Sequence, residues 1–163
     1  VQVPHVNTAS DARRAVESVK YHPLGSRGLA AGTRSGDYGF GMSASEYVEQ
    51  ANRETLVCVQ LEEEEALANI DDILDVDGVD VFFVGPSDLS QSMGYPGRTS
   101  SPQVQEAIDG AFARIVAASK TPGCSGNAET ALDYRRKGVR YLYTHVPTLL
   151  SQASAQFLAA VKE

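Results

Sequence analysis

The sequence predicts an α/β protein with one parallel β-sheet covered by helices. Short, near-continuous apolar runs rich in β-branched and aromatic residues have the pattern of buried parallel strands. Segments with apolar residues at helical spacing lie between them, and the two kinds of segment alternate along the chain. Five strand–helix units make up about five-eighths of a (β/α)8 barrel, whose usual size is about 250 residues. An open, doubly wound five-stranded sheet fits the same pattern, so periodicity leaves both architectures open.

Five segments are expected to form the strands. Four of them are apolar, whereas the fourth along the chain, "TPGCSGN", is a poor strand by propensity because it contains Pro and Gly. In chain order the expected strands are residues 1–6, 55–62, 79–85, 121–127 and 139–146.

The expected helices carry recognisable end signals. Thr8 or Ser10 suits the N-cap of the first, Gly138 follows the end of the fifth, and Pro147 suits the first turn of the last. In chain order the expected helices are residues 8–21, 46–54, 63–76, 101–120, 128–138 and 147–163. The Gly- and Ser-rich residues 22–45 are expected to form a long loop, and such loops are usually functional or mobile.

Composition limits the classes of function. The 163 residues suit one domain, residues 1–163, and their net charge of −7 argues against a nucleic-acid partner. No apolar run reaches the length of a membrane span, and no signal peptide is recognisable. The two cysteines favour reduced thiols, so we expect a cytoplasmic protein. The chain begins at Val1 inside an expected strand, which is typical of a segment of a longer barrel.

Polar side chains follow two consecutive expected strands. Gln60 and Glu62 are two residues apart, so they lie on the same side of their strand, and Asp88 follows the next strand. Because consecutive strands usually pair about 4.8 Å apart, Glu62 and Asp88 are expected to lie within reach of one divalent ion. Two carboxylates with open positions suit Mg²⁺ or Mn²⁺, and the backbone N–H groups of Ser87 and Asp88 suit an anionic ligand.

Purely structural explanations stay open for the same residues. Glu62 opens the acidic run 62–65, which the helix dipole alone favours in a first turn, and Asp88 suits an N-cap or turn. His5 and His145 end strands and are weaker acid–base candidates, and a solvated loop position explains Arg27.

Other motifs give no sign of a nucleotide or zinc site. Tyr141 and Tyr143 alternate as packing residues on one face of a strand. The stretch "GNAET" lacks both the P-loop lysine and the GxGxxG pattern, so a nucleotide site is not expected. No cysteine or histidine cluster has zinc spacing.

The stretch "VCVQLEEEEALANIDDILDVDGVDVFFVGPSDLSQSMGYPG" closely resembles the metal-dependent, class II pyruvate aldolases of the HpcH/HpaI type. The stretches "KYHPLGSRGLA", "QANRETLV" and "SPQVQEAI" fit in the same order, so the resemblance covers essentially the whole chain. It implies a parallel (β/α) barrel of the phosphoenolpyruvate/pyruvate superfamily, here a partial barrel of about five βα units. The first three units of the barrel, with the family's catalytic histidine, aspartate and arginine, are expected to be absent, so no catalytic residue is assigned.

The resemblance also implies roles for the motif residues. Glu62 and Asp88 would hold a divalent metal ion, Mg²⁺ or Mn²⁺, whereas Gln60, Ser87 and Asp88 would bind the substrate. The implied activity is an aldehyde-lyase that cleaves or forms 4-hydroxy-2-oxo acids through a metal-bound pyruvate enolate, with pyruvate and an aldehyde as partners.

Three alternatives remain beside the aldolase. A CoA-thioester lyase on the same scaffold uses similar chemistry, and a non-catalytic partial barrel would bind metal or oxo-acid or oligomerise. A flavodoxin-like domain would make Asp88 an ordinary turn residue. Two exposed strand edges also lead us to expect a homo-oligomer.

Overall fold

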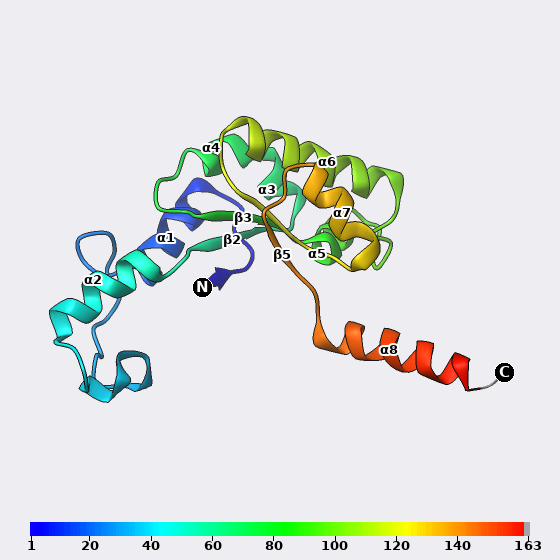
Figure 1. Cartoon of the computed structure of the whole chain (residues 1–163). Coiled ribbons are helices and arrows are strands. Elements are labelled where there is room, and N and C mark those ends of the chain that lie inside the picture. The colour runs from blue at the N-terminus through cyan, green and yellow to red at the C-terminus, as the bar shows by residue number, and fades with distance from the viewer. Residues whose placement is uncertain (162–163) are drawn as a thin grey trace.

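The computed structural model describes residues 1–161, which form one curved parallel sheet with helices packed against it (Figure 1). The strands are β1 (Gln2–Val3), β2 (Cys58–Leu61), β3 (Val81–Val84), β4 (Pro122–Ser125) and β5 (Tyr141–Tyr143). Their spatial order is β1-β2-β3-β4-β5, and every neighbouring pair is parallel.

This strand order decides between the two predicted architectures. In a doubly wound sheet the order reverses at a switch point, whereas here each strand pairs with the next one in sequence. One apolar cluster joins Leu61, Phe82 and Val84 to the helices, while the cluster on the opposite face contains strand residues alone. The prediction of a partial barrel is therefore confirmed, and the flavodoxin-like alternative is wrong.

The first and fifth expected helices have side-chain N-caps just before their first residues. Thr8 caps the first and forms a capping box with Asp11, and Asn127 caps the helix after β4. The helices are α1 (Ala9–Val19), the 3-10 helix η1 (Arg34–Gly39), α2 (Ala44–Glu54), α3 (Glu64–Ala68), α4 (Ile70–Leu74), α5 (Pro86–Ser92), α6 (Pro102–Ala117), α7 (Ala128–Arg136) and α8 (Val146–Ala160).

Three helical predictions differ from the structure, the first being the expected loop 22–45, which contains η1 and the first two residues of α2. The expected helix 63–76 divides into α3 and α4 at Asn69, whose side-chain amide donates a hydrogen bond to the Asn7 carbonyl (2.9 Å). The segment after β3, expected as a loop, forms α5 with Pro86 in its first turn. The expected final helix runs to residue 163, but residues 162 and 163 lie outside the described part of the chain.

Strand β4 contains Gly123, which lowers its strand propensity. Close packing of the neighbouring strands requires a residue without a side chain at this position. A Cβ at Gly123 would lie 2.9 Å from Val81 Cγ1 and 3.1 Å from Phe83 Cδ2. Gly123 therefore leaves room for the side chains of Val81 and Phe83 on the concave face of the sheet, the face without helices.

Helix α8 stands apart from the rest of the molecule (Figure 1), and none of its residues is buried. Its exposed large apolar side chains are Val146, Leu149, Leu150, Phe157 and Leu158. None of the helices within residues 1–161 combines the length and apolar character that a bilayer crossing requires.

Replacement of Phe82 by Ala tests the helix-covered core. Phe82 is 0% exposed, so Phe82→Ala is expected to lower the free energy of unfolding by about 3–5 kcal/mol. Phe40 is 74% exposed, so Phe40→Ala is expected to change it by at most about 0.5 kcal/mol. Urea unfolding followed by circular dichroism measures both, and equal losses would contradict this assignment of the core.

Candidate functional site

A hollow of about 210 Å³ lies at the carboxyl ends of the central strands. It contains all four residues that the sequence predicted as metal or substrate ligands. The residues that line it are Gln60, Glu62, Phe83, Gly85, Pro86, Ser87, Asp88, Ser125, Tyr143 and His145. The position agrees with the rule that parallel α/β sheets bind ligands beyond the carboxyl ends of their strands.

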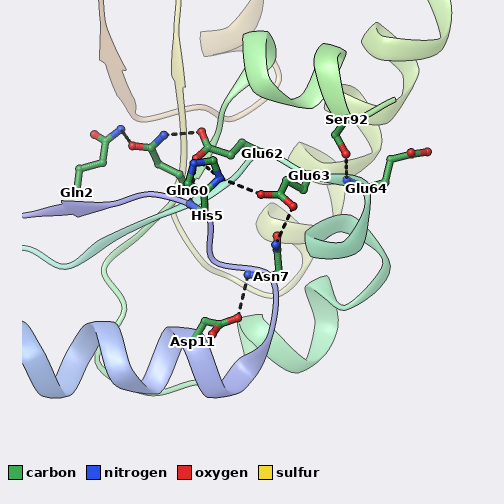
Figure 2. A network of polar contacts seen from close by, with 9 residues as sticks. All are labelled: Gln2, His5, Asn7, Asp11, Gln60, Glu62, Glu63, Glu64 and Ser92. Carbon is green, nitrogen blue, oxygen red and sulfur yellow. Dashed lines mark hydrogen bonds and ion pairs between the residues drawn. The ribbon is translucent and has the colours of Figure 1, made fainter. Parts of the chain in front are cut away.

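Glu62 is the buried acidic residue of this hollow, with 1% of its surface exposed. One carboxylate oxygen, Oε1, accepts a hydrogen bond from the backbone N–H of His5 (3.0 Å), and Oε2 accepts one from the Gln60 amide (2.6 Å) (Figure 2). Both donors are neutral groups. A buried carboxylate with neutral donors suits a position next to a cation.

Gly85 makes room for this carboxylate. Leu61 pairs with Val84 in the β2–β3 register, so the residues that follow them, Glu62 and Gly85, lie side by side. A Cβ at Gly85 would lie 2.7 Å from Glu62 Oε2 and 2.8 Å from Glu62 Cβ. Glycine is therefore required at position 85 because the Glu62 side chain approaches the backbone closely, and not because the backbone adopts a positive φ.

Gln2 fixes the orientation of the Gln60 amide. The Gln2 side-chain N–H donates to Gln60 Oε1 (2.9 Å), so the Gln60 NH₂ group is left to point at Glu62 (Figure 2). Across the concave face, the Tyr141 hydroxyl donates to Gln2 Oε1 (3.4 Å). Gln2 is not among the residues predicted from the sequence, although it is the one polar residue of the apolar run "VQV".

His5 lies directly beside Glu62, a contact that the sequence did not predict. Its ring Nδ1 is 2.9 Å from Glu63 Oε1 and 3.5 Å from Glu62 Oε1. Its backbone adopts a left-handed conformation with φ 54°, which is uncommon for a residue other than glycine. The hydrogen bond to Glu63, together with the charge of Glu62, raises the pKa of the His5 imidazole above its ordinary value.

Glu63 has a specific structural role as well. Its Oε1 meets the His5 ring, while its Oε2 accepts a hydrogen bond from the Asn7 amide (2.9 Å) (Figure 2). The two contacts tie the segment after β1 to the end of β2. The helix dipole alone therefore does not account for Glu63, because its carboxylate also holds His5 and Asn7.

Ser87 and Asp88 approach the hollow from the first turn of α5, and both are exposed. Within residues 1–161, no group of three or more His, Cys, Asp and Glu side chains is arranged to hold a metal ion. The carboxylates that line the hollow are those of Glu62 and Asp88. Such a set suits a hard cation that keeps water or takes substrate oxygens at its other positions.

The remaining candidates divide between two places. His145 and Tyr143 line the hollow, and Tyr143 stacks on Phe83 with ring centroids 5.3 Å apart, as expected for a packing residue. Arg27 lies outside this hollow, over the ring of Tyr21 (4.7 Å), and lines a separate cavity of about 450 Å³ beside α2.

Neither cysteine is suited to act as a nucleophile. Burial raises the pKa of the Cys58 and Cys124 thiols to about 12, so both stay protonated at neutral pH.

The chain is similar to known proteins over nearly its whole length. The family model described as HpcH/HpaI aldolase/citrate lyase matches residues 1–141. A 4-hydroxy-2-oxo-heptane-1,7-dioate aldolase of Shigella flexneri is 39% identical over 160 residues, which cover 97% of this chain and 59% of that protein. The chain thus spans about three-fifths of the length of this curated relative.

Solved structures show the same relationship. An HpcH/HpaI aldolase/citrate lyase family protein from Burkholderia cenocepacia superposes with a TM-score of 0.90 at 29% identity, over 99% of this chain and 64% of that one. An HpcH/HpaI aldolase from Desulfitobacterium hafniense superposes with a TM-score of 0.83 at 29% identity, over 99% of this chain and 63% of that one. The chain therefore belongs to the HpcH/HpaI aldolase/citrate lyase family.

Proposed function

We propose that this chain carries the metal-binding and pyruvate-binding part of an aldolase, an aldehyde-lyase that cleaves or forms 4-hydroxy-2-oxo acids. The observation that supports it most is the convergence of Gln60, Glu62, Ser87 and Asp88 on one hollow at the carboxyl ends of β2 and β3. The name of the Shigella flexneri relative describes a reaction of this class.

In this proposal Glu62 and Asp88 hold a divalent ion, Mg²⁺ or Mn²⁺. The fit rests on the buried Glu62 carboxylate, whose two hydrogen-bond donors are the His5 backbone N–H and the Gln60 amide, and on the exposed Asp88 carboxylate at the same hollow. When bound, such an ion supplies Lewis-acid polarisation of the 2-oxo group of the substrate.

The residues of the chain bind and orient the oxo-acid. The Gln60 amide, held in one orientation by Gln2, would contact the oxo-acid, and the backbone N–H of Ser87 would bind its carboxylate. In the cleavage direction the C3–C4 bond breaks, and its electron pair passes into the pyruvate portion. The C4 hydroxyl loses its proton as the aldehyde C=O forms, and C3 of pyruvate later takes up a proton.

The chain is also proposed to work as a homo-oligomer in the cytoplasm. Helix α8 exposes large apolar side chains, and a groove of about 310 Å³ beside it is lined by Ala131, Leu142 and Leu149. Exposed apolar surface of this kind is typical of an interface. Free, buried Cys58 and Cys124 suit a reducing compartment.

Calorimetric titration of Mn²⁺ tests the metal site, with oxalate as a mimic of the pyruvate enolate. We expect Mn²⁺ binding that oxalate strengthens. Glu62→Gln and Asp88→Asn should each weaken it about tenfold or more, because even partners outside the ligand shell contribute that much. Asp72→Asn, an exposed change on α4, serves as the control. Unchanged binding in Glu62→Gln or Asp88→Asn would exclude these residues as ligands.

Replacement of Gln2 by Leu tests the orientation of Gln60. Loss of the Gln2 donor releases the Gln60 amide, so oxalate affinity in the presence of Mn²⁺ should fall about twofold to tenfold. The matched change Gln50→Leu lies on α2 away from the hollow and should leave affinity unchanged. Equal affinities for the two variants would show that Gln2 does not position Gln60.

Light scattering after size-exclusion chromatography tests the assembly. The wild-type chain is expected to elute as an oligomer, and Leu150→Asp with Phe157→Asp should produce monomers because burial of a charge in an apolar interface is unfavourable. Gln152→Asp on the same helix is the matched control. A monomeric wild type, or an oligomer that survives the double change, would contradict the proposed role of α8.

A further inference from the structure

The cavity of about 450 Å³ beside α2 is not used by the proposed aldolase site. Its lining includes Thr55, which precedes β2, whereas the Glu62 hollow lies where β2 and β3 end. The two spaces share no lining residue among those that the structure describes. Helix α2 and the segment before it, which build most of the cavity wall, project from the body at the left of Figure 1.

Charged side chains of both signs line this cavity. Arg27 supplies a guanidinium group, and Asp37 and Glu54 supply two carboxylates. Three neutral polar side chains complete the polar part of the wall, namely Ser35, Tyr47 and Gln50. The wall therefore presents partners for an anionic group and for a cationic group within one space.

Arg27 is held in a defined place. Its guanidinium carbon lies 4.7 Å from the centre of the Tyr21 ring, and its backbone N–H donates to the Lys20 carbonyl (3.0 Å). Tyr21 is buried and meets the Tyr47 ring edge-on, with the ring centroids 5.8 Å apart. A guanidinium stacked on an aromatic face keeps its N–H edge available for a planar carboxylate.

The end of α2 is fixed as well. The buried Lys20 ammonium donates to the carbonyls of Asn52 (2.8 Å) and Thr55 (2.6 Å). Tyr21 donates its backbone N–H to Asn52 Oδ1 (2.7 Å), and the Asn52 amide donates back to the Tyr21 carbonyl (3.0 Å). The last turn of α2, with Glu54, is therefore tied to the segment that carries the guanidinium.

Asp37 reaches the cavity from a strained part of η1. Asp37 and Tyr38 both adopt left-handed backbone conformations, with φ 51° and 55°. Two consecutive residues other than glycine in this region cost conformational energy, and such strain is found mostly where a ligand is held. Because η1 packs against α2, the Asp37 carboxylate lies on the same wall as that of Glu54.

We propose that this cavity binds a small zwitterion, an α-amino acid with an apolar side chain. The Arg27 guanidinium pairs with its carboxylate, and Asp37 and Glu54 meet its ammonium group. Met42 and Ala51 supply apolar surface for its side chain. A ligand with only one of the two charges leaves a charged group of the wall without a partner, which costs affinity. This binding is independent of the proposed aldolase function.

Calorimetric titration of L-leucine into the full chain tests the inference. The compound that lacks its carboxylate is 3-methylbutylamine, and the compound that lacks its ammonium group is 4-methylpentanoate. We expect leucine to bind about tenfold or more tightly than either, because each of these loses a charged contact. No binding of leucine, or equal binding of either compound, would overturn the inference.

Two substitutions test the charged groups separately. Arg27→Met and Asp37→Asn should each weaken leucine binding about tenfold or more. Arg98→Met is the matched control, because Arg98 stacks on Tyr95 in the same way (5.3 Å) but on the segment after α5. Circular dichroism checks the fold of each variant. Unchanged affinity in Asp37→Asn, an exposed change of nearly constant volume, or in a folded Arg27→Met would contradict the inference.

Amide NMR spectra locate the bound leucine. The signals of Ser35, Gly36 and Tyr47 should shift on titration, while those of Glu62 and Asp88 stay in place. Shifts confined to Glu62, Asp88 and their neighbours would show that leucine binds in the oxo-acid hollow, and would overturn the assignment of this cavity.

Discussion

The parallel pairing of β2 with β3 is the constraint on which the site depends. Because Leu61 is level with Val84, the next residues, Glu62 and Gly85, meet at the carboxyl edge of the sheet. Gly85 has no side chain, so the Glu62 carboxylate occupies the space that a Cβ would need. A shift of one residue in this register would turn Gln60 and Glu62 together to the other face of the sheet and separate Glu62 from Gly85.

The two faces of the sheet divide stability from function. The convex face buries Leu61, Phe82 and Val84 against the helices, and burial of this kind supplies most of the free energy of folding. The concave face carries Phe83 and two tyrosines together with the Gln2–Gln60 pair. The polar side chains on this face form hydrogen bonds with one another. These hydrogen bonds offset the cost of burying polar groups and keep the Gln2 and Gln60 amides in fixed orientations.

The segment after β1 holds the acidic end of β2 in place. His5 donates its backbone N–H to Glu62 and sets its ring against Glu63, while Asn7 binds Glu63 from the other side. These contacts hold His5 at a positive φ that its own backbone preference disfavours. Groups fixed in this way before a ligand arrives lose little entropy on binding, which is the usual arrangement of catalytic sites.

The sequence by itself determined all five strands, most helices and the residue types of the candidate site. Strand and helix periodicity is a property of a few neighbouring residues, Gln60 and Glu62 lie at the end of one apolar run, and Asp88 closely follows the next, so these features were predictable. Tertiary structure alone decided the strand order, the formation of β4 around Gly123, and the contacts of Gln2 and His5 with residues 57 and 58 positions away. Such contacts depend on which strands pair across the whole chain, and local periodicity carries no information about that pairing.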